Sequence, residues 1–164
     1  MLGPRLLEQA LELQSAAIVK SVLDRGVSAN ERVNGSYIRW GSLVMYTFPL
    51  HVATIAGNIE ILNVLLSFGA RVDLCDTDGN TALMLACAGN NIHAVRVLVE
   101  AGADLNLIDS NQRSALVIAA ALNKTDIISL IANQGGQISE RMLLRTCEIS
   151  SVSAHALELL LRTS

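Results

Sequence analysis

The chain has 164 residues, of which 51% are hydrophobic and only 3% aromatic, and its formal net charge at pH 7 is -3. This length fits one ordinary domain, and a composition led by leucine and alanine favours helices over a β-sandwich. Because 12 basic residues are set against 15 acidic ones, the chain has no basic face for a phosphate backbone. We therefore expect no nucleic-acid partner.

The first segment, residues 6–30, has the apolar pattern of two short helices and places a glycine, Gly26, after the second. A unit at the end of a stack of repeats has only one neighbour, so its outer side must be polar. We therefore expect this segment to be an outward-facing terminal unit. Its first helix supplies the polar residues Glu8, Gln9, Glu12 and Gln14.

The next segment, residues 36–48, holds four of the five aromatic residues of the chain. The overlapping stretch 41–59 is uncharged and as long as a membrane span. It is interrupted by Gly41, Pro49 and Gly57, and its second half belongs to a repeat. We therefore expect no insertion into a membrane.

Three consecutive segments repeat one pattern at a period of 33 residues without a gap, starting at Phe48, Thr81 and Ser114. Each segment reads as two short helices followed by an extended finger. Glycine follows each second helix, where the chain needs a left-handed cap. A leucine recurs at the same position of each segment and is predicted to lie in the core: Leu50, Leu83 and Leu116. The glycine after the second helix recurs as Gly69, Gly102 and Gly135.

These units resemble ankyrin repeats, which open with Thr-Pro-Leu-His. The openings here are Phe-Pro-Leu-His from Phe48, Thr-Ala-Leu-Met from Thr81 and Ser-Ala-Leu-Val from Ser114. Phe48 departs from the family's threonine cap, so either Thr47 caps this helix or the cap is lost at a cost of about 1 kcal/mol. The resemblance implies that His51 forms hydrogen bonds between adjacent loops.

We therefore predict an all-α ankyrin-repeat solenoid of about five helix-turn-helix units with β-hairpin fingers, in a single domain over residues 1–164. The units span about 5–36, 48–80, 81–113 and 114–138, and a last pair of helices forms a C-terminal cap over 139–164.

The period is broken once, because the step from Gly26 to Gly69 is 43 residues and ten extra residues lie within 37–47. Asn34-Gly35 falls at the ordinary finger tip and is a strong hairpin signal. A second candidate turn at Gly41-Ser42 would place Tyr37 opposite Tyr46.

This insertion has two interpretations. Tyrosine, tryptophan and arginine dominate the energetics of protein interfaces, so the insertion is predicted to contact a partner through Tyr37, Arg39, Trp40 and Tyr46. Alternatively, a long loop needs a small core of its own, in which Trp40 and Met45 seal the first unit.

The resemblance also implies a concave binding surface made of finger tips and first helices. The matching positions are Thr77, Asp78, Asn80, Ala88 and Gly89 in the third unit, and Ser110, Asn111, Arg113, Ala121 and Leu122 in the fourth.

Five aspartates lie along the fingers: Asp73, Asp76, Asp78, Asp104 and Asp109. They favour a partner with a basic surface, whose binding would weaken with salt. The alternative is that these aspartates simply begin turns.

The cysteines and histidines lack the spacing of a metal site or a catalytic pair. We expect Cys75, Cys87 and Cys147 to be buried free thiols in a reducing compartment, which favours an intracellular, cytoplasmic location or else a nuclear one. His93 and His155 are expected to be exposed. The sequence thus predicts no enzyme, metal, cofactor or small-molecule ligand.

The predicted function is recognition of a partner protein, as an adaptor or scaffold domain. The alternative is a self-contained inhibitor, or an immunity-type protein, that blocks the site of a partner enzyme.

Overall fold

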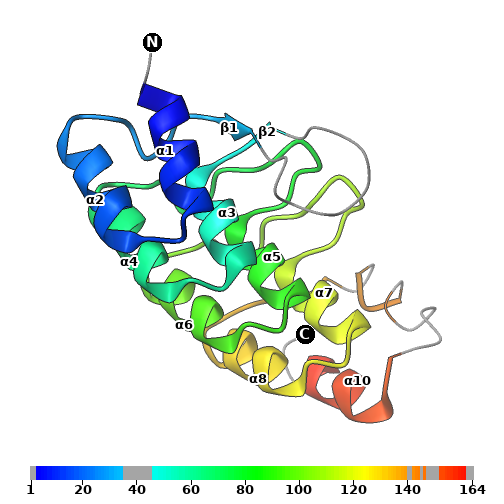
Figure 1. Ribbon diagram of the computed structural model, residues 1–164. Helices are drawn as coiled ribbons and strands as arrows, with labels where there is room; N and C mark the ends of the chain where they lie inside the picture. Colours follow the sequence, from blue (N-terminus) through cyan, green and yellow to red (C-terminus); the bar gives the residue numbers. More distant parts are fainter. Residues whose placement is uncertain (1–2, 35–45, 140–141, 145, 147–151, 162–164) are drawn as a thin grey trace.

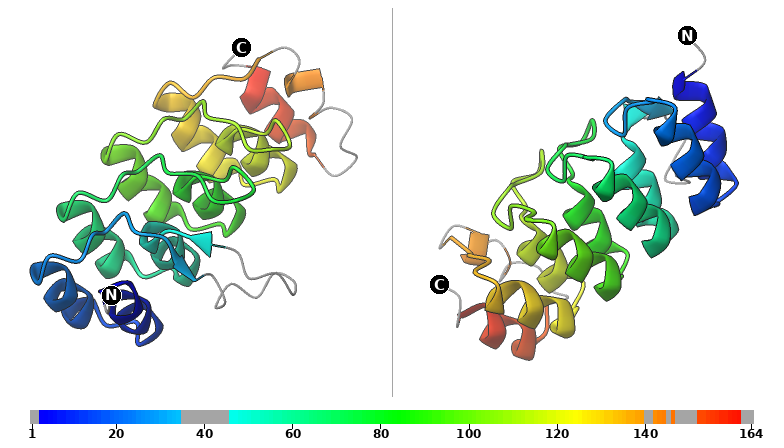
Figure 2. Two further views of the ribbon diagram at one scale, coloured as in Figure 1. Left: turned by 90° about the horizontal axis from the view of Figure 1, so that it is seen from above. Right: turned by 90° about the vertical axis from the view of Figure 1, so that its left-hand side faces the viewer.

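The computed structural model describes residues 3–34, 46–139, 142–144, 146 and 152–161. Helix pairs stack side by side in two rows, and extended fingers project beside the first row (Figure 1). The two ends of the chain lie at opposite ends of the stack (Figure 2). This arrangement confirms the predicted all-α solenoid.

The first row consists of α1 (Gly3–Glu12), α3 (Pro49–Ala56), α5 (Ala82–Ala88) and α7 (Ala115–Ala121). The second row consists of α2 (Ala16–Asp24), α4 (Ile59–Ser67), α6 (Ile92–Glu100) and α8 (Thr125–Asn133). Helix α10 (Ala154–Leu161) packs against α8 at the C-terminal end, and residues 142–144 and 146 are also helical.

The core runs along the stack between the two rows. The recurring leucines Leu50, Leu83 and Leu116 are exposed by 2%, 1% and 0%, which confirms their predicted burial. Each second helix is followed by a glycine with positive φ, and Gly102, at +84°, has the predicted left-handed conformation.

One side chain per finger ties each unit to the next. The acceptor oxygens belong to Asn30, Asp73 and Asn106, which occupy the same position in successive units, and the donors are backbone N–H groups. The three bonds are Arg71 N to Asn30 Oδ1 at 2.7 Å, Asp104 N to Asp73 Oδ1 at 3.0 Å, and Gln137 N to Asn106 Oδ1 at 2.9 Å. The spacing between neighbouring fingers is therefore set by hydrogen bonds as well as by helix packing.

Several helices begin at a side-chain cap. The caps are Asn58, Thr81, Asn91 and Ser114, each of which accepts a hydrogen bond from the backbone N–H three residues later, at 3.0 to 3.4 Å. Phe48 provides no such bond, and Thr47 Oγ1 is buried without a partner among the described residues. The cap of α3 is therefore lost, which decides between the two alternatives raised by the sequence.

Phe48 packs its ring where the other units place a cap. The ring lies 5.7 Å from that of His51, between centroids, and 5.9 Å from the guanidinium carbon of Arg32. Pro49 occupies the first turn of α3, where its missing N–H is not needed.

The finger between the first two units contains a short antiparallel pair of strands, β1 (Val33–Asn34) and β2 (Tyr46–Thr47). Val33 pairs with Thr47 at the position where Asp76 N donates to Asn80 O in the next finger, at 3.0 Å. Three residues separate Asp76 from Asn80, whereas thirteen separate Val33 from Thr47. The ten extra residues are thus added at the tip, and the base keeps the common register.

This register corrects the predicted turn at Asn34, because Asn34 lies in a strand opposite Tyr46. The reason is that the base of the finger sets the pairing: Glu8 Oε1, from α1, accepts a hydrogen bond from Asn34 N at 2.7 Å. Glu8 is accordingly half-buried rather than part of the polar outer surface. The turn at Gly41-Ser42 lies outside the described residues.

Replacing Leu83 by alanine should lower the free energy of unfolding by about 2 to 5 kcal/mol, because the side chain is fully buried in the middle of the stack. Urea denaturation followed by circular dichroism measures the change. The exposed Leu13 offers a matched control, since Leu13→Ala should cost well under half as much. Equal losses for both variants would contradict the packing described above.

Candidate protein-binding surface

The finger tips of the third and fourth units lie next to each other. Ser110 N donates a hydrogen bond to Asp78 O at 3.0 Å, so the two tips are joined through their backbones. Gly79 permits this approach, because a Cβ at that position would lie 3.0 Å from Ser110 N. The side chains of Thr77, Asp78, Ser110 and Asn111 remain exposed on this joined surface.

Other predicted contact residues have structural partners. Asn80 is half-buried: its backbone and side-chain N–H groups bond to Asp76, and its carbonyl lies 3.0 Å from His51 Nε2. Arg113 forms an ion pair with Asp109 at 2.6 Å, although 46% of its side chain is exposed. Asn80 is therefore less available to a partner than the sequence suggested, whereas Arg113 offers only part of its guanidinium.

The predicted contacts in the insertion can be placed only in part. Tyr46 belongs to β2 through its backbone, at the base of the finger. Tyr37, Arg39 and Trp40 lie outside the described residues.

Four of the five finger aspartates accept hydrogen bonds from the backbone. Asp76 accepts from Asp78 N and Asn80 N, and Asp109 from Asn111 N and Arg113 N. Asp73 accepts from the next finger and Asp104 from Asn106 N. Within the described chain, the Asp78 carboxylate alone of the five accepts no such bond. The turn-forming interpretation therefore accounts for most of the acidic strip.

Asp109 illustrates this structural role. Burial raises the pKa of its carboxyl, but hydrogen bonds from the side chain and backbone of Arg113, together with the charge of Arg113, outweigh it and hold the pKa below its ordinary value. Asp109 is 2% exposed, so its charge is directed at Arg113 rather than at a partner.

A row of exposed residues at the C-terminal ends of the first helices was only partly predicted. Leu122, predicted from the resemblance, is 45% exposed. Leu13 occupies the same position in the first unit and is 66% exposed, and Ile55, one position earlier in its unit, is 38% exposed. Alignment of the units was the signal that could have found Leu13 and Ile55. Between these large residues the row contains the exposed Ala88 and Gly89.

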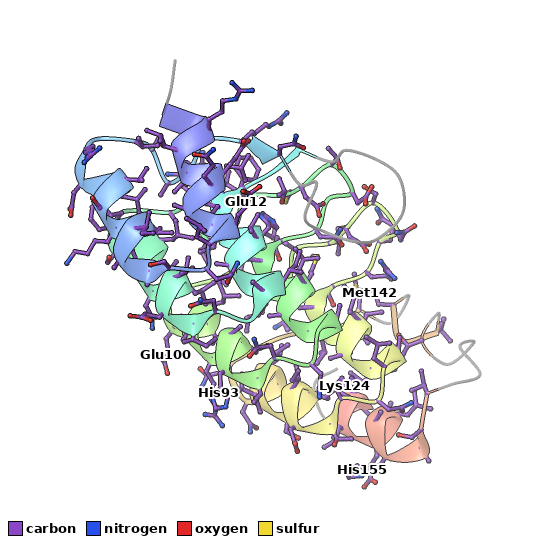
Figure 3. All side chains as sticks on the ribbon, in the orientation of Figure 1. Glu12, His93, Glu100, Lys124, Met142 and His155 are labelled. Atoms are coloured by element: carbon purple, nitrogen blue, oxygen red, sulfur yellow. The ribbon has the colours of Figure 1, made fainter. Side chains whose placement is uncertain are left out.

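The histidines have the predicted roles. His93 and His155 are exposed on the second-helix side of the stack (Figure 3). His51 is 1% exposed and joins adjacent units, since its Nε2–H donates to the carbonyl of Asn80, which can only accept. Desolvation lowers the pKa of His51 below 6.5, although the carbonyls of Asn80 and Leu74 and the charge of Asp76 act to raise it.

The cysteines differ from one another. Burial raises the pKa of the Cys87 thiol to about 12, as expected for an inert core residue. Cys75 is exposed, so its predicted burial is wrong: alternate residues of the extended finger point outward. Desolvation and the charges of Asp76 and Asp73 raise its pKa, which disfavours a reactive thiolate. Cys147 lies outside the described residues.

In the described parts of the chain, no helix combines the length and hydrophobicity of a membrane span. Among the same residues, no three histidine, cysteine, aspartate or glutamate side chains converge as metal ligands would.

The family model for ankyrin repeats in three copies matches residues 48–142. The chain belongs to the ankyrin-repeat family. Ankyrin repeats are generally protein–protein interaction modules and are typically not enzymes.

Two similar proteins are longer than this chain. Over 73 residues the ankyrin-repeat chain is 37% identical to the transient receptor potential cation channel subfamily V member 5 of Mus musculus, covering 43% of the chain and 10% of the channel. Over 38 residues it is 47% identical to the putative palmitoyltransferase ZDHHC13 of Danio rerio, covering 23% of the chain and 6% of that protein. The chain thus spans a tenth or less of the length of these relatives.

Stability should fall as the pH is lowered below about 6.5, because the unfolded chain then binds a proton at residue 51 while the folded chain does not. The loss is at most about 1.4 kcal/mol per pH unit and ends at the folded pKa. His51→Gln should remove this part of the pH dependence, whatever its effect on stability at pH 7.5. Urea denaturation at pH 7.5 and 5.5 measures it, with His93→Gln as the control; an unchanged pH dependence in His51→Gln would refute the assignment.

Proposed function

We propose that this ankyrin-repeat chain binds a partner protein through the face formed by its finger tips and the C-terminal ends of its first helices. Support comes first from the family, whose members generally bind proteins. The finger tips contribute exposed polar groups at Thr77, Asp78, Ser110 and Asn111. Their joined backbones present these groups at fixed spacing, which reduces the entropy that binding must overcome.

The row of exposed apolar residues is the observation that carries the proposal. Leu13, Ile55 and Leu122 are exposed, come from three units and occupy equivalent or adjacent positions in the repeat. Single exposed apolar residues are ordinary, whereas an aligned row suits a partner's apolar side chains. Ala88 and Gly89, between them, leave space for larger side chains of the partner.

We propose that the insertion within residues 37–47 extends this surface. The residues that flank it, Asn34 in β1 and Tyr46 in β2, lie on the side where the fingers project (Figure 1). Tyr37, Arg39 and Trp40 have the composition of interface hot spots. We propose that they contact the partner next to the finger tips.

The proposal also specifies the charge of the partner. Because most finger aspartates are engaged by backbone N–H groups, we propose that a basic partner group meets the exposed Asp78 rather than an extended acidic strip. One exposed pair contributes about 0 to 1 kcal/mol, so the salt dependence of binding should be shallow.

Leu122→Glu should abolish recovery of the partner in affinity purification, because it places a charge within the apolar row. Asn63→Glu adds the same charge on the exposed side of α4 and should leave recovery unchanged. Quantitative mass spectrometry of the recovered proteins provides the measurement. Equal recovery with both variants would contradict the proposed face.

Trp40→Ala tests the insertion separately. Loss of partner binding at an unchanged melting temperature would place Trp40 at the interface. A lower melting temperature with unchanged binding would instead assign it to the small core that the sequence left as the alternative.

An inhibitor would use the same face. If the recovered partner is an enzyme that loses activity in a one-to-one complex with this chain, the inhibitor function replaces the adaptor function. Retained activity in the complex supports the adaptor.

A further inference from the structure

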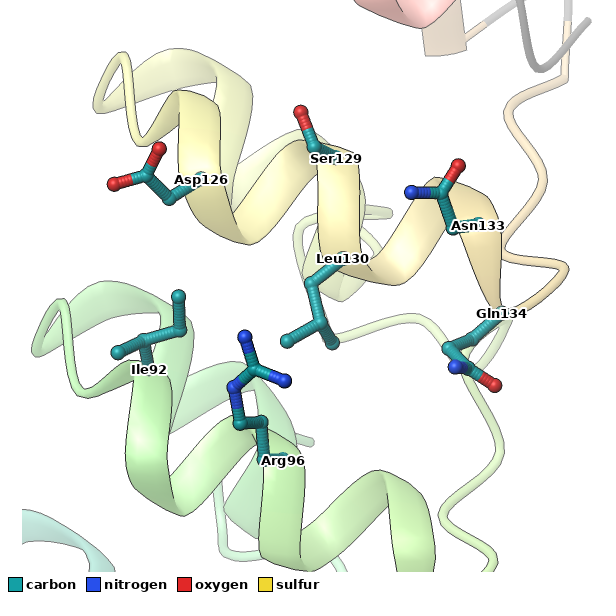
Figure 4. A pocket seen from close by; sticks show the side chains of 7 residues that line it. All are labelled: Ile92, Arg96, Asp126, Ser129, Leu130, Asn133 and Gln134. Carbon is teal, nitrogen blue, oxygen red and sulfur yellow. The ribbon is translucent and has the colours of Figure 1, made fainter.

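A groove of about 410 Å³ lies between α6 and α8 (Figure 4), in the row of second helices and away from the finger tips (Figure 1). It is an open groove rather than an enclosed cavity. Its lining combines apolar and polar groups: Ile92 and Arg96 from α6, Asp126, Ser129, Leu130 and Asn133 from α8, and Gln134 after it.

The sequence explains why the groove opens at this seam. Asp126, Ser129 and Asn133 occupy the positions that His93, Arg96 and Glu100 occupy one unit earlier. These three side chains of α8, which line the groove, are shorter than their counterparts one unit earlier on α6. Because they are shorter, they leave space between the two helices.

Arg96 is the cationic side chain among the residues that line the groove. Its guanidinium reaches from α6 into the space between Ile92 and Leu130 (Figure 4). Arg96 is exposed. Unlike Arg113, which is paired with Asp109, it forms no ion pair with any residue in the described ranges. A guanidinium offers five N–H donors in a planar fork that fits a carboxylate.

The neighbouring groups restrict what Arg96 can bind. Ile92 and Leu130 are half-buried and present apolar surface on either side of the guanidinium. Asn133 and Gln134 add amide N–H donors at one end, whereas the Asp126 carboxylate at the other end repels a second acidic group. This pattern fits one carboxylate beside one apolar side chain and disfavours a run of acidic residues.

We propose that the groove between α6 and α8 docks a second protein segment, in which an aspartate or glutamate binds Arg96 and an adjacent apolar side chain packs against the apolar surface of Ile92 or Leu130 beside the guanidinium. This site is separate from the face in the proposed function. An ankyrin-repeat chain with both sites would hold two partners on opposite rows of its helices.

The probes are three capped, alanine-rich helical peptides of about 16 residues that carry a leucine and, four residues later, glutamate, glutamine or lysine. The two side chains then lie on one face of the helix. Titration of ¹⁵N-labelled protein, monitored by amide chemical shifts, gives both the affinity and the location. The glutamate peptide should shift amides of α6 and α8, and the glutamine peptide should bind about tenfold or more weakly, because it lacks the charge-assisted bonds.

Arg96→Gln should weaken binding of the glutamate peptide about tenfold or more. Lys20→Gln, at the equivalent exposed position of α2, removes the same charge and should have no effect. Leu122→Glu should also leave peptide binding unchanged, which separates this site from the proposed face. Equal binding of the lysine peptide, shifts confined to the fingers, or undiminished affinity in Arg96→Gln would each overturn the proposal.

Discussion

Each helix pair of this protein has apolar residues on more than one side and buries them only against its neighbours. Leu83 is covered because α3 and α7 flank α5, and the same holds along the stack. This constraint fixes the order and spacing of the units. The fingers, the ends of the first helices and the gaps between second helices then follow at regular intervals, so every candidate binding feature depends on the stacking.

The repeat pattern made much of the fold predictable. Leucines and glycines that recur every 33 residues identified the core and the ends of the second helices, because a buried position and a left-handed turn each admit few residue types. The bonds between units were harder to foresee. Asn30, Asp73 and Asn106 share one position, but which backbone group each accepts from depends on the placement of the following unit.

The candidate site was less predictable than the core, because exposure depends on details of the loops. Asn80 looked available to a partner but serves His51 and Asp76, whereas Cys75 looked buried but faces outward. The turn predicted at Asn34 was wrong for a related reason. The local turn signal at Asn34 competes with the base of the finger, where Glu8 and Thr47 hold the strands in the common register.

The common register at the finger base separates the length of the tip from the stability of the stack. Val33 and Thr47 pair as Asp76 and Asn80 do, whether thirteen residues or three lie between them. The tip can therefore differ in length and sequence between units while the helices on either side keep their contacts. A repeat stack built in this way can change one loop without altering the packing of its core.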